Sequence, residues 1–142
     1  MKRAEAVEIA TGVAWNYLGH WYTWGGDDPA GFDCSGLVIE VLKSVGLLPR
    51  GGDWTAHSLW QIFRPERVDQ PSEGCLVFYR NADRSRVVHV EYCLNGGVSI
   101  GASGGGSTTR TIDDAIRQNA FIKIRPVRAG ASFANPFLRT GE

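Results

Sequence analysis

Cys34 is the residue whose type and position first indicate chemistry. Residues 33–36 are Asp-Cys-Ser-Gly, and apolar residues then recur at helical spacing: Leu37, Val38, Val41, Leu42 and Val45. Asp33 is a good N-cap, so we expect Cys34 in the first turn of a helix. A helix N-terminus favours the nucleophilic thiolate, and its unpaired N–H groups can hold an oxyanion. The alternative is a small, inert cysteine buried at the start of a helix.

His89 is the candidate base for this nucleophile. A catalytic cysteine needs a nearby histidine, which is usually distant in the sequence. Residues 87–94 alternate as a β-strand does, with His89, Glu91 and Cys93 on one face and apolar residues on the other. The sequence therefore offers a nucleophile on a helix and a base on a strand.

These segments together resemble the NlpC-type cell-wall cysteine peptidases, a papain-like family. The resemblance is found in residues 22–37, 74–79 and 89–96, and it covers about residues 5–127. It implies an enzyme that hydrolyses peptidoglycan stem peptides, with a D-γ-glutamyl–diamino acid bond as the expected target. The cysteine would attack the peptide carbonyl, and the histidine would act first as a base and then as an acid.

Two alternatives to this function stay open. The first is a peptidoglycan amidase or an acyl transferase of the same fold. The second is a non-catalytic module that binds wall peptides without cutting them. The pair Cys34 and His89 argues against the second alternative, because a module without activity has no chemical need for both residues.

The third catalytic position of the family departs from the expected pattern. Relatives have a His, Asn or Gln there, twelve residues after the histidine, and this chain has Gly101. If residues 95–97 form the turn, Glu91 lies opposite Gly101, and its carboxylate can fill the vacant space and accept a hydrogen bond from His89. The alternative is a Glu91 on the solvated rim of the strand. Two weaker candidates for the same role are Ser99 and Ser103.

Three further residues match substrate-contacting positions of the family. Tyr22 matches a tyrosine beside the cysteine, which would hold the oxyanion or bind substrate; simple aromatic packing is the alternative. Asp33 and Ser35 match positions that contact the free amine of the substrate in some relatives. For Asp33 the helix cap alone is a sufficient explanation.

The loop before the cysteine is rich in aromatic residues and glycines. The aromatic residues are expected to line a substrate cleft and to pin the loop to the core: Trp21, Tyr22, Trp24 and Phe32. Gly25 and Gly26 would let a substrate backbone approach closely.

The order of the predicted elements indicates an α+β fold. Helices are predicted over residues 4–18, 34–46 and 56–63, and strands over 75–80, 87–94, 98–103 and 121–127; residues 111–120 are expected to be helical or irregular. The resemblance implies a papain-like core, with the nucleophile helix packed on an antiparallel sheet of about five strands. We expect residues 1–142 to form a single domain, with a loosely packed tail from about residue 128.

Composition excludes several classes of partner and site. Lys and Arg total 15, as do Asp and Glu, so the formal net charge is zero. We therefore expect neither nucleic acid nor a membrane surface as partner, and peptidoglycan stem peptides instead. No Cys-x-x-Cys or His-x-x-x-His motif occurs, so no metal or other cofactor is predicted. Cys75 and Cys93 are expected to be small core residues.

The N-terminus begins with basic residues but contains no apolar signal-peptide core. We therefore expect no signal peptide, although the expected substrate is in the bacterial cell wall. This combination indicates either a mature fragment or a phage protein, such as a lysin or a tail component. The sequence predicts no particular oligomeric state.

Overall fold

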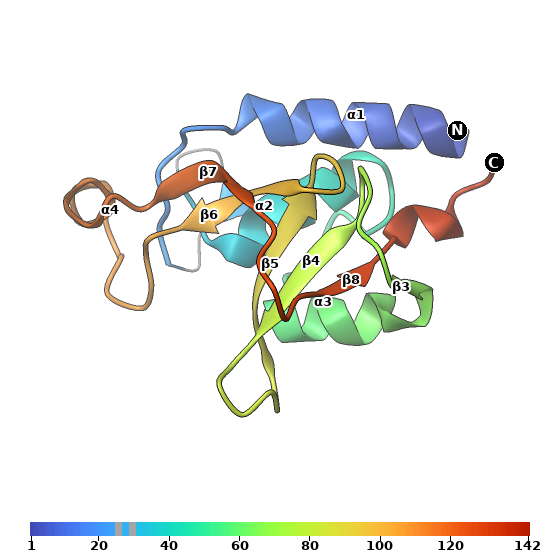
Figure 1. Cartoon of the computed structure of the whole chain (residues 1–142). Helices are drawn as coiled ribbons and strands as arrows, with labels where there is room; N and C mark the ends of the chain where they lie inside the picture. The colour runs from blue at the N-terminus through green and yellow to red at the C-terminus, as the bar shows by residue number, and fades with distance from the viewer. Residues whose placement is uncertain (25–26, 29–30) are drawn as a thin grey trace.

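The computed structural model describes residues 1–24, 27–28 and 31–142. Gly25 and Gly26, expected near the substrate backbone, lie outside the described residues, as does the side chain of Phe32. Helices lie against an antiparallel sheet, and the two termini are close together at one end of the molecule (Figure 1). The predicted α+β class is confirmed.

Three of the helices cover the sheet, and each begins close to its predicted position. They are α1 (Arg3–Asn16), α2 (Cys34–Ser44) and α3 (Ala56–Phe63), and a shorter helix, α4 (Ile112–Gln118), forms within residues 111–120. The carboxylate of Asp33 caps α2 by accepting the N–H of Gly36 at 2.7 Å. Local side-chain chemistry thus fixes the start of the helix that begins with Cys34.

The main sheet has six strands in the order β3-β8-β4-β5-β6-β7. Their bounds are β3 Arg67–Val68, β4 Leu76–Arg80, β5 Val87–Cys93, β6 Val98–Ser103, β7 Phe121–Pro126 and β8 Ser132–Ala134. Four short elements complete the described chain. The strands β1 (Asp27–Asp28) and β2 (Gly31–Phe32) form a separate two-stranded sheet, and η1 (Arg64–Glu66) and η2 (Pro136–Arg139) are 3₁₀ turns.

The β5–β6 hairpin has the predicted register. Tyr92 lies opposite Ile100 and Cys93 opposite Ser99, so residues 95–97 form the turn. This pairing matches apolar side chains on the face that is buried under the helices. The next pair away from the turn brings Glu91 opposite Gly101.

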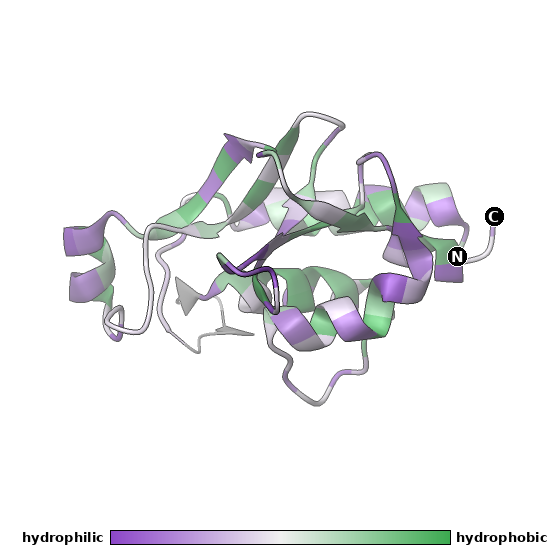
Figure 2. Ribbon diagram, turned by 60° about the horizontal axis from the view of Figure 1, so that its bottom comes forward, coloured by the Kyte–Doolittle hydropathy of each residue, from purple (hydrophilic) through white to green (hydrophobic). Residues whose placement is uncertain are grey.

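The two faces of the sheet differ in size and content. The larger core lies between the helices and one face, and includes Val90, Tyr92 and Ile100. A smaller cluster on the other face is built around Cys75, Val77 and Cys93. Hydrophobic residues gather on the sheet and on the helix sides that face it (Figure 2). Glu91, which lies between two residues of the larger core, therefore points to the face of the smaller cluster.

The tail is the element that the sequence predicted wrongly. Residues from about 128 were expected to be loosely packed, but β8 is inserted between β3 and β4, and Ala134 and Phe137 are fully buried. The physical reason lies in β4: Leu76, Val77 and Phe78 are buried on both faces. Such a strand is interior to a sheet and needs hydrogen-bonded partners on both edges.

Candidate active site

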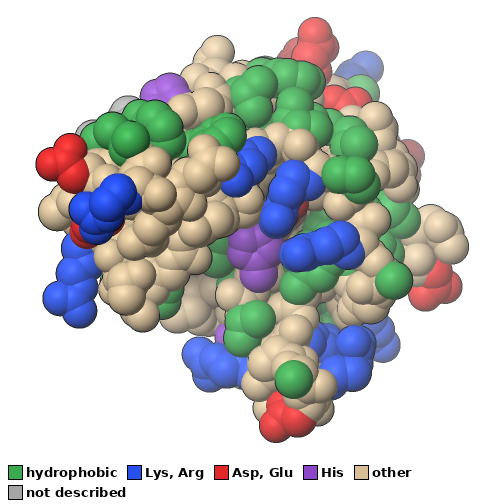
Figure 3. Space-filling view, turned by 60° about the vertical axis from the view of Figure 1, so that its left-hand side comes forward, with side chains coloured by type: hydrophobic (Ala, Val, Ile, Leu, Met, Phe, Trp, Pro, Cys, Tyr) green, Lys and Arg blue, Asp and Glu red, His purple; other side chains and the backbone are tan. Residues whose placement is uncertain are grey.

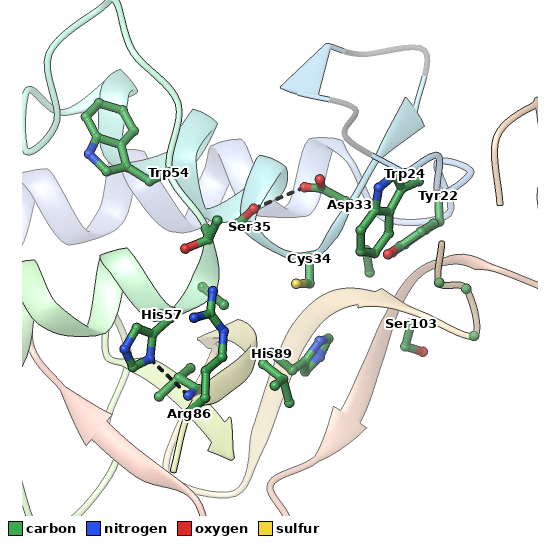
Figure 4. Close-up of a pocket in the computed structure, with 18 of the residues that line it drawn as sticks. Tyr22, Trp24, Asp33, Cys34, Ser35, Trp54, His57, Arg86, His89 and Ser103 are labelled. Carbon is green, nitrogen blue, oxygen red and sulfur yellow. Dashed lines mark hydrogen bonds between the residues drawn. The ribbon is translucent and has the colours of Figure 1, made fainter. Parts of the chain in front are cut away.

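Cys34 lies at the first position of α2 and faces a cleft of about 760 Å³ (Figure 4). The cleft is lined by α2, by the segment before it, by the start of β5 and by the end of β6. The thiol is partly buried, and the amide groups of the first helical turn lie beside it. This position gives a nucleophile access to both solvent and unpaired N–H donors.

His89 connects Cys34 to Glu91. The imidazole lies close enough to Cys34 for the thiol to affect its pKa, while Nε2 lies 2.6 Å from Oε2 of Glu91, which leaves Nδ1 free to face the thiol. Burial opposes protonation of the imidazole, but the hydrogen bonds and negative charges of Cys34 and Glu91 outweigh it and raise the pKa of His89 to about 9. The raised pKa of His89 and the ionised carboxylate of Glu91 favour an imidazolium at this position.

Glu91 is a buried carboxylate with three donors. Its side chain is 1% exposed, and it accepts hydrogen bonds from His89, from Ser99 at 2.7 Å and from Arg125 at 2.5 Å. Burial alone would raise its pKa, but the hydrogen bonds and the charge of the imidazolium lower the pKa of Glu91 to about 2. The contact between Glu91 and His89 that the sequence predicted is therefore present.

Gly101 provides the space for this carboxylate. A Cβ atom at Gly101 would lie 2.4 Å from Cγ of Glu91 and 2.8 Å from its Cδ. Real Cβ atoms do not approach other atoms so closely. The Glu91 side chain therefore fills the space that a side chain at residue 101 would need. The glycine at residue 101 and the glutamate at residue 91 are therefore two parts of one arrangement.

Tyr22 forms one side of the cleft next to Cys34. Burial and the charges of Cys34 and Asp33 raise the pKa of Tyr22 above its usual value, so its hydroxyl stays protonated and can donate. A Cβ atom at Gly105 would lie 2.6 Å from the Tyr22 ring. Ser35, also in the cleft, donates to Asp33 at 3.2 Å.

The sequence patterns did not identify the opposite wall of the cleft. Trp54, His57 and Arg86 lie there, across Cys34 from Tyr22 (Figure 4). Basic side chains also surround a histidine on one face of the molecule (Figure 3), and Arg125 and Arg128 are among the cleft residues. These residues come from separate segments, so no short motif connects them.

The other two cysteines have a different environment. Cys75 and Cys93 are fully buried in the smaller cluster, as predicted. Burial, with the nearby charges of Cys75 and Glu91, raises the pKa of Cys93 to about 12. Both are therefore structural thiols rather than nucleophiles.

The described part of the chain contains no group of three or more His, Cys, Asp or Glu residues placed to hold a metal ion. It also contains no helix that is long and apolar enough to span a bilayer. Of the predicted site residues, Tyr22, Asp33, Cys34, Ser35 and His89 line the cleft, and Glu91 lies behind His89.

Comparisons with known proteins identify relatives over most of the chain. The sequence model of the NlpC/P60 family matches residues 19–126. Protein P54 of Enterococcus faecium is 38% identical over 89 residues, which are 63% of this chain and 16% of that protein. Murein DD-endopeptidase MepH of Escherichia coli is 36% identical over 103 residues, 66% of this chain and 36% of that protein. The chain spans only a minor part of the length of these curated relatives.

Solved structures extend the similarity to the fold. The NlpC/p60 domain of the peptidoglycan hydrolase SagA has a TM-score of 0.65 at 27% identity, covering 91% of this chain and 97% of that one. The peptidoglycan hydrolase RipB of Mycobacterium tuberculosis has a TM-score of 0.68 at 27% identity, covering 93% of this chain and 65% of that one.

Proposed function

The chain belongs to the NlpC/P60 family, and from that premise we propose that it is a cysteine endopeptidase that hydrolyses peptidoglycan stem peptides. The observation that supports this function most directly is the position of His89, which lies with Cys34 in one cleft and forms a hydrogen bond to Glu91 on its other side. A nucleophile, a base and a group that orients the base are the parts that acyl transfer requires.

In the proposed reaction, the Sγ atom of Cys34 attacks the carbonyl carbon of the scissile amide. The negative charge that develops on the carbonyl oxygen is stabilised by the backbone N–H of Cys34 and by the hydroxyl of Tyr22. His89 then protonates the leaving amine, and a thioester acyl-enzyme is formed. A water molecule, deprotonated by His89, hydrolyses the thioester and restores the thiol.

Glu91 acts in this scheme as a positioning residue. It holds Nε2 of the imidazole, so that Nδ1 faces the thiol, and its charge stabilises the imidazolium. Ser99 and Arg125 hold the carboxylate in turn, which keeps it in a single orientation. Family members supply this function from the position of Gly101, and in this chain the neighbouring strand supplies it instead.

The finer substrate assignment follows from the family resemblance. We propose the D-γ-glutamyl–diamino acid bond as the target, with Asp33 and Ser35 near the free amine of the acyl half. A phage lysin or tail component is the proposed context. The relative from Escherichia coli is named a DD-endopeptidase, so the products must decide which bond is cut.

The test is mass spectrometry of muropeptides after incubation with the wild type, Cys34→Ala and Cys75→Ala, each shown to be folded by circular dichroism. Cleavage by the wild type and Cys75→Ala alone supports a Cys34 peptidase, and the fragment masses identify the bond, an amidase or an acyl transferase. Cleavage by Cys34→Ala would exclude this nucleophile. No cleavage by any folded variant would favour a binding module.

A further inference from the structure

The two sides of the cleft differ in the chemistry that they offer a ligand. Tyr22 and Asp33 lie on one side of Cys34, while His57 and Arg86 lie on the other (Figure 4). The first side contains a carboxylate, which suits the free amine of the acyl half. A substrate whose scissile bond lies at Cys34 and whose acyl half lies on the first side must place its leaving half on the second side. The polar groups there are a guanidinium and an imidazole.

Arg86 is held at this second side by the hairpin that precedes β5. Its backbone N–H donates to Oδ1 of Asn81 at 3.1 Å, and its side chain points towards Cys34 in Figure 4. Within the described residues, its guanidinium forms no ion pair with a carboxylate. A guanidinium can donate two parallel hydrogen bonds to one carboxylate and has no acceptor of its own.

His57 adds a second donor to the same side. Its Nδ1 accepts the backbone N–H of Val87 at 3.1 Å, so the hydrogen of the neutral ring is on Nε2 (Figure 4). The acidic residue of this wall, Asp53, accepts the N–H of Trp54 at 2.9 Å. Besides this carboxylate, the side of the cleft beyond Cys34 presents the donors of Arg86 and His57, which can bind an anionic group.

Arg128 strengthens this bias along the cleft. Its guanidinium carbon lies 4.3 Å from the ring centre of Tyr79, a stacking contact that fixes the side chain without neutralising it. Like Arg86, it forms no ion pair with any carboxylate in the part of the chain that the structure describes. By contrast, the third arginine, Arg125, already forms an ion pair with Glu91.

We propose that Arg86 and His57 form a subsite for a carboxylate on the leaving half of the substrate. The inference rests on the proposed peptidase function, because it is the reaction that defines a leaving half. Two carboxylates have the required chemistry: the second carboxylate on a diamino acid side chain, and the C-terminal carboxylate of the peptide. A stem peptide amidated at the recognised position is accordingly a poorer substrate.

The kinetic test uses synthetic stem peptides in pairs, with a free carboxylate or a primary amide at one position. One pair differs at the diamino acid side chain and the other at the C-terminus. We expect the wild type to prefer the free carboxylate in one pair by about tenfold in kcat/KM, mainly through KM, as for an exposed charge-assisted contact. Arg86→Gln is expected to bring that pair to within about twofold.

The matched control is Arg84→Gln, which removes the same charge from the same hairpin. Arg84 contacts the carbonyl of Gly130 and does not line the cleft. The Arg84→Gln variant is expected to keep the wild-type preference for the free carboxylate. A wild type without preference in either pair, or an unchanged preference in Arg86→Gln, would overturn the subsite while leaving the peptidase assignment intact.

A binding measurement separates this inference from the proposed function. Cys34→Ala is titrated calorimetrically with the leaving fragment in its carboxylate and amide forms. The same titrations are then made with the double variant Cys34→Ala, Arg86→Gln. Tighter binding of the carboxylate, lost with Arg86→Gln, supports the subsite even if the wild type cuts no stem peptide. Equal binding of the two forms contradicts it even if cleavage is efficient.

Discussion

Two glutamate–arginine pairs of this molecule have similar contacts and different surroundings. Glu91 pairs with Arg125 in the sheet, and Glu66 pairs with Arg139 between η1 and η2. Both arginines donate directly to a carboxylate, at 2.5 Å in the first pair and at 2.7 Å and 2.9 Å in the second. The Glu91 side chain is 1% exposed, whereas that of Glu66 is 19% exposed.

This difference in exposure indicates what each pair does. A buried carboxylate loses hydration that a single arginine barely replaces, so Glu91 needs the further donors Ser99 and His89. The outer pair loses less hydration and fastens the C-terminal turn to the α3–β3 connection, with Arg139 also donating to the carbonyl of Ile62. We interpret the inner pair as functional and the outer pair as structural.

The largest effect should come from removing the inner carboxylate. We expect Glu91→Ala to lower kcat on stem peptides by about 10²- to 10⁴-fold, because the imidazole loses the group that orients it. The half-buried guanidinium of Arg125 and the buried hydroxyl of Ser99 also lose their acceptor, which should destabilise the fold. The measurement is steady-state kinetics at a temperature where far-UV circular dichroism shows a folded variant.

The control for that experiment is Glu66→Ala, which removes the outer carboxylate and should leave kcat unchanged. If both variants lose activity in proportion to their loss of stability, the distinction between a functional and a structural pair is wrong.

A charge-only change at the same position should shift a pH profile. The pKa of His89 is about 9 with Glu91 ionised, so kcat/KM should fall as the pH rises through about 9 in the wild type. Glu91→Gln keeps a hydrogen-bond acceptor but removes the negative charge, so the alkaline limb should move to lower pH by about one unit. If Glu91 has only a structural role, Glu91→Gln would change the melting temperature and leave the alkaline limb of the kcat/KM profile at the same pH.

The same pKa values predict how stability depends on pH. The pKa of His89 is raised above 6.5, so its protonation stabilises the fold fully below about pH 6.5, and this contribution is lost as the pH rises through about 9. The pKa of Glu91 is lowered from 4.5, so its contribution is present above that value and is lost as the pH falls through about 2. Urea unfolding across this range should show less alkaline loss in Glu91→Gln than in the wild type.

A smaller effect is expected from filling the space at Gly101. Gly101→Ala should destabilise the fold by about 1–3 kcal/mol and reduce kcat, because the new Cβ atom must displace Glu91. Gly12→Ala, in α1 and with nothing within 4 Å of the added atom, is the matched control and should not destabilise.

Restoring the family arrangement would sharpen the test. The double variant Glu91→Ala, Gly101→Asn places a polar side chain where the family resemblance implies one, after clearing the space. It should have a higher kcat than Glu91→Ala alone, and equal kcat values would show that residue 101 cannot supply the missing group.

The smallest effect should come from the outer pair. Arg139→Gln is expected to lower the free energy of unfolding by about 0.5–1 kcal/mol, the usual range for a partly exposed ion pair, with no change in kcat. Urea denaturation and the muropeptide assay measure the two quantities separately. A loss of activity here would mean that the tail influences the cleft.

Local patterns in the sequence predicted much of the site. Asp33 as a cap, residues 95–97 as a turn and the alternation of β5 were enough to place Cys34 on a helix start and Glu91 opposite Gly101. Each of these depends on neighbours within a few residues, or on one short hairpin. Conversely, Arg125 joins Glu91 across a connection of 17 residues between β6 and β7, whose pairing no local rule fixes.

The insertion of β8 could not be predicted for a related reason. Its three residues give a weak periodic signal, and the need for them arises in β4, more than fifty positions earlier. The basic wall of the cleft was missed because Arg86 and His57 become neighbours only when α3 packs beside β5.

The position of β8 also has a consequence for the order of events during translation. A ribosome releases the chain from the N-terminus, so Cys34 and His89 emerge well before Ala134. Until Ala134 has emerged, one edge of β4 has no partner, and β4 pairs directly with the strand that contains His89 and Glu91. The nascent chain thus contains the side chains of the proposed site before it contains the strand that completes the sheet beside them.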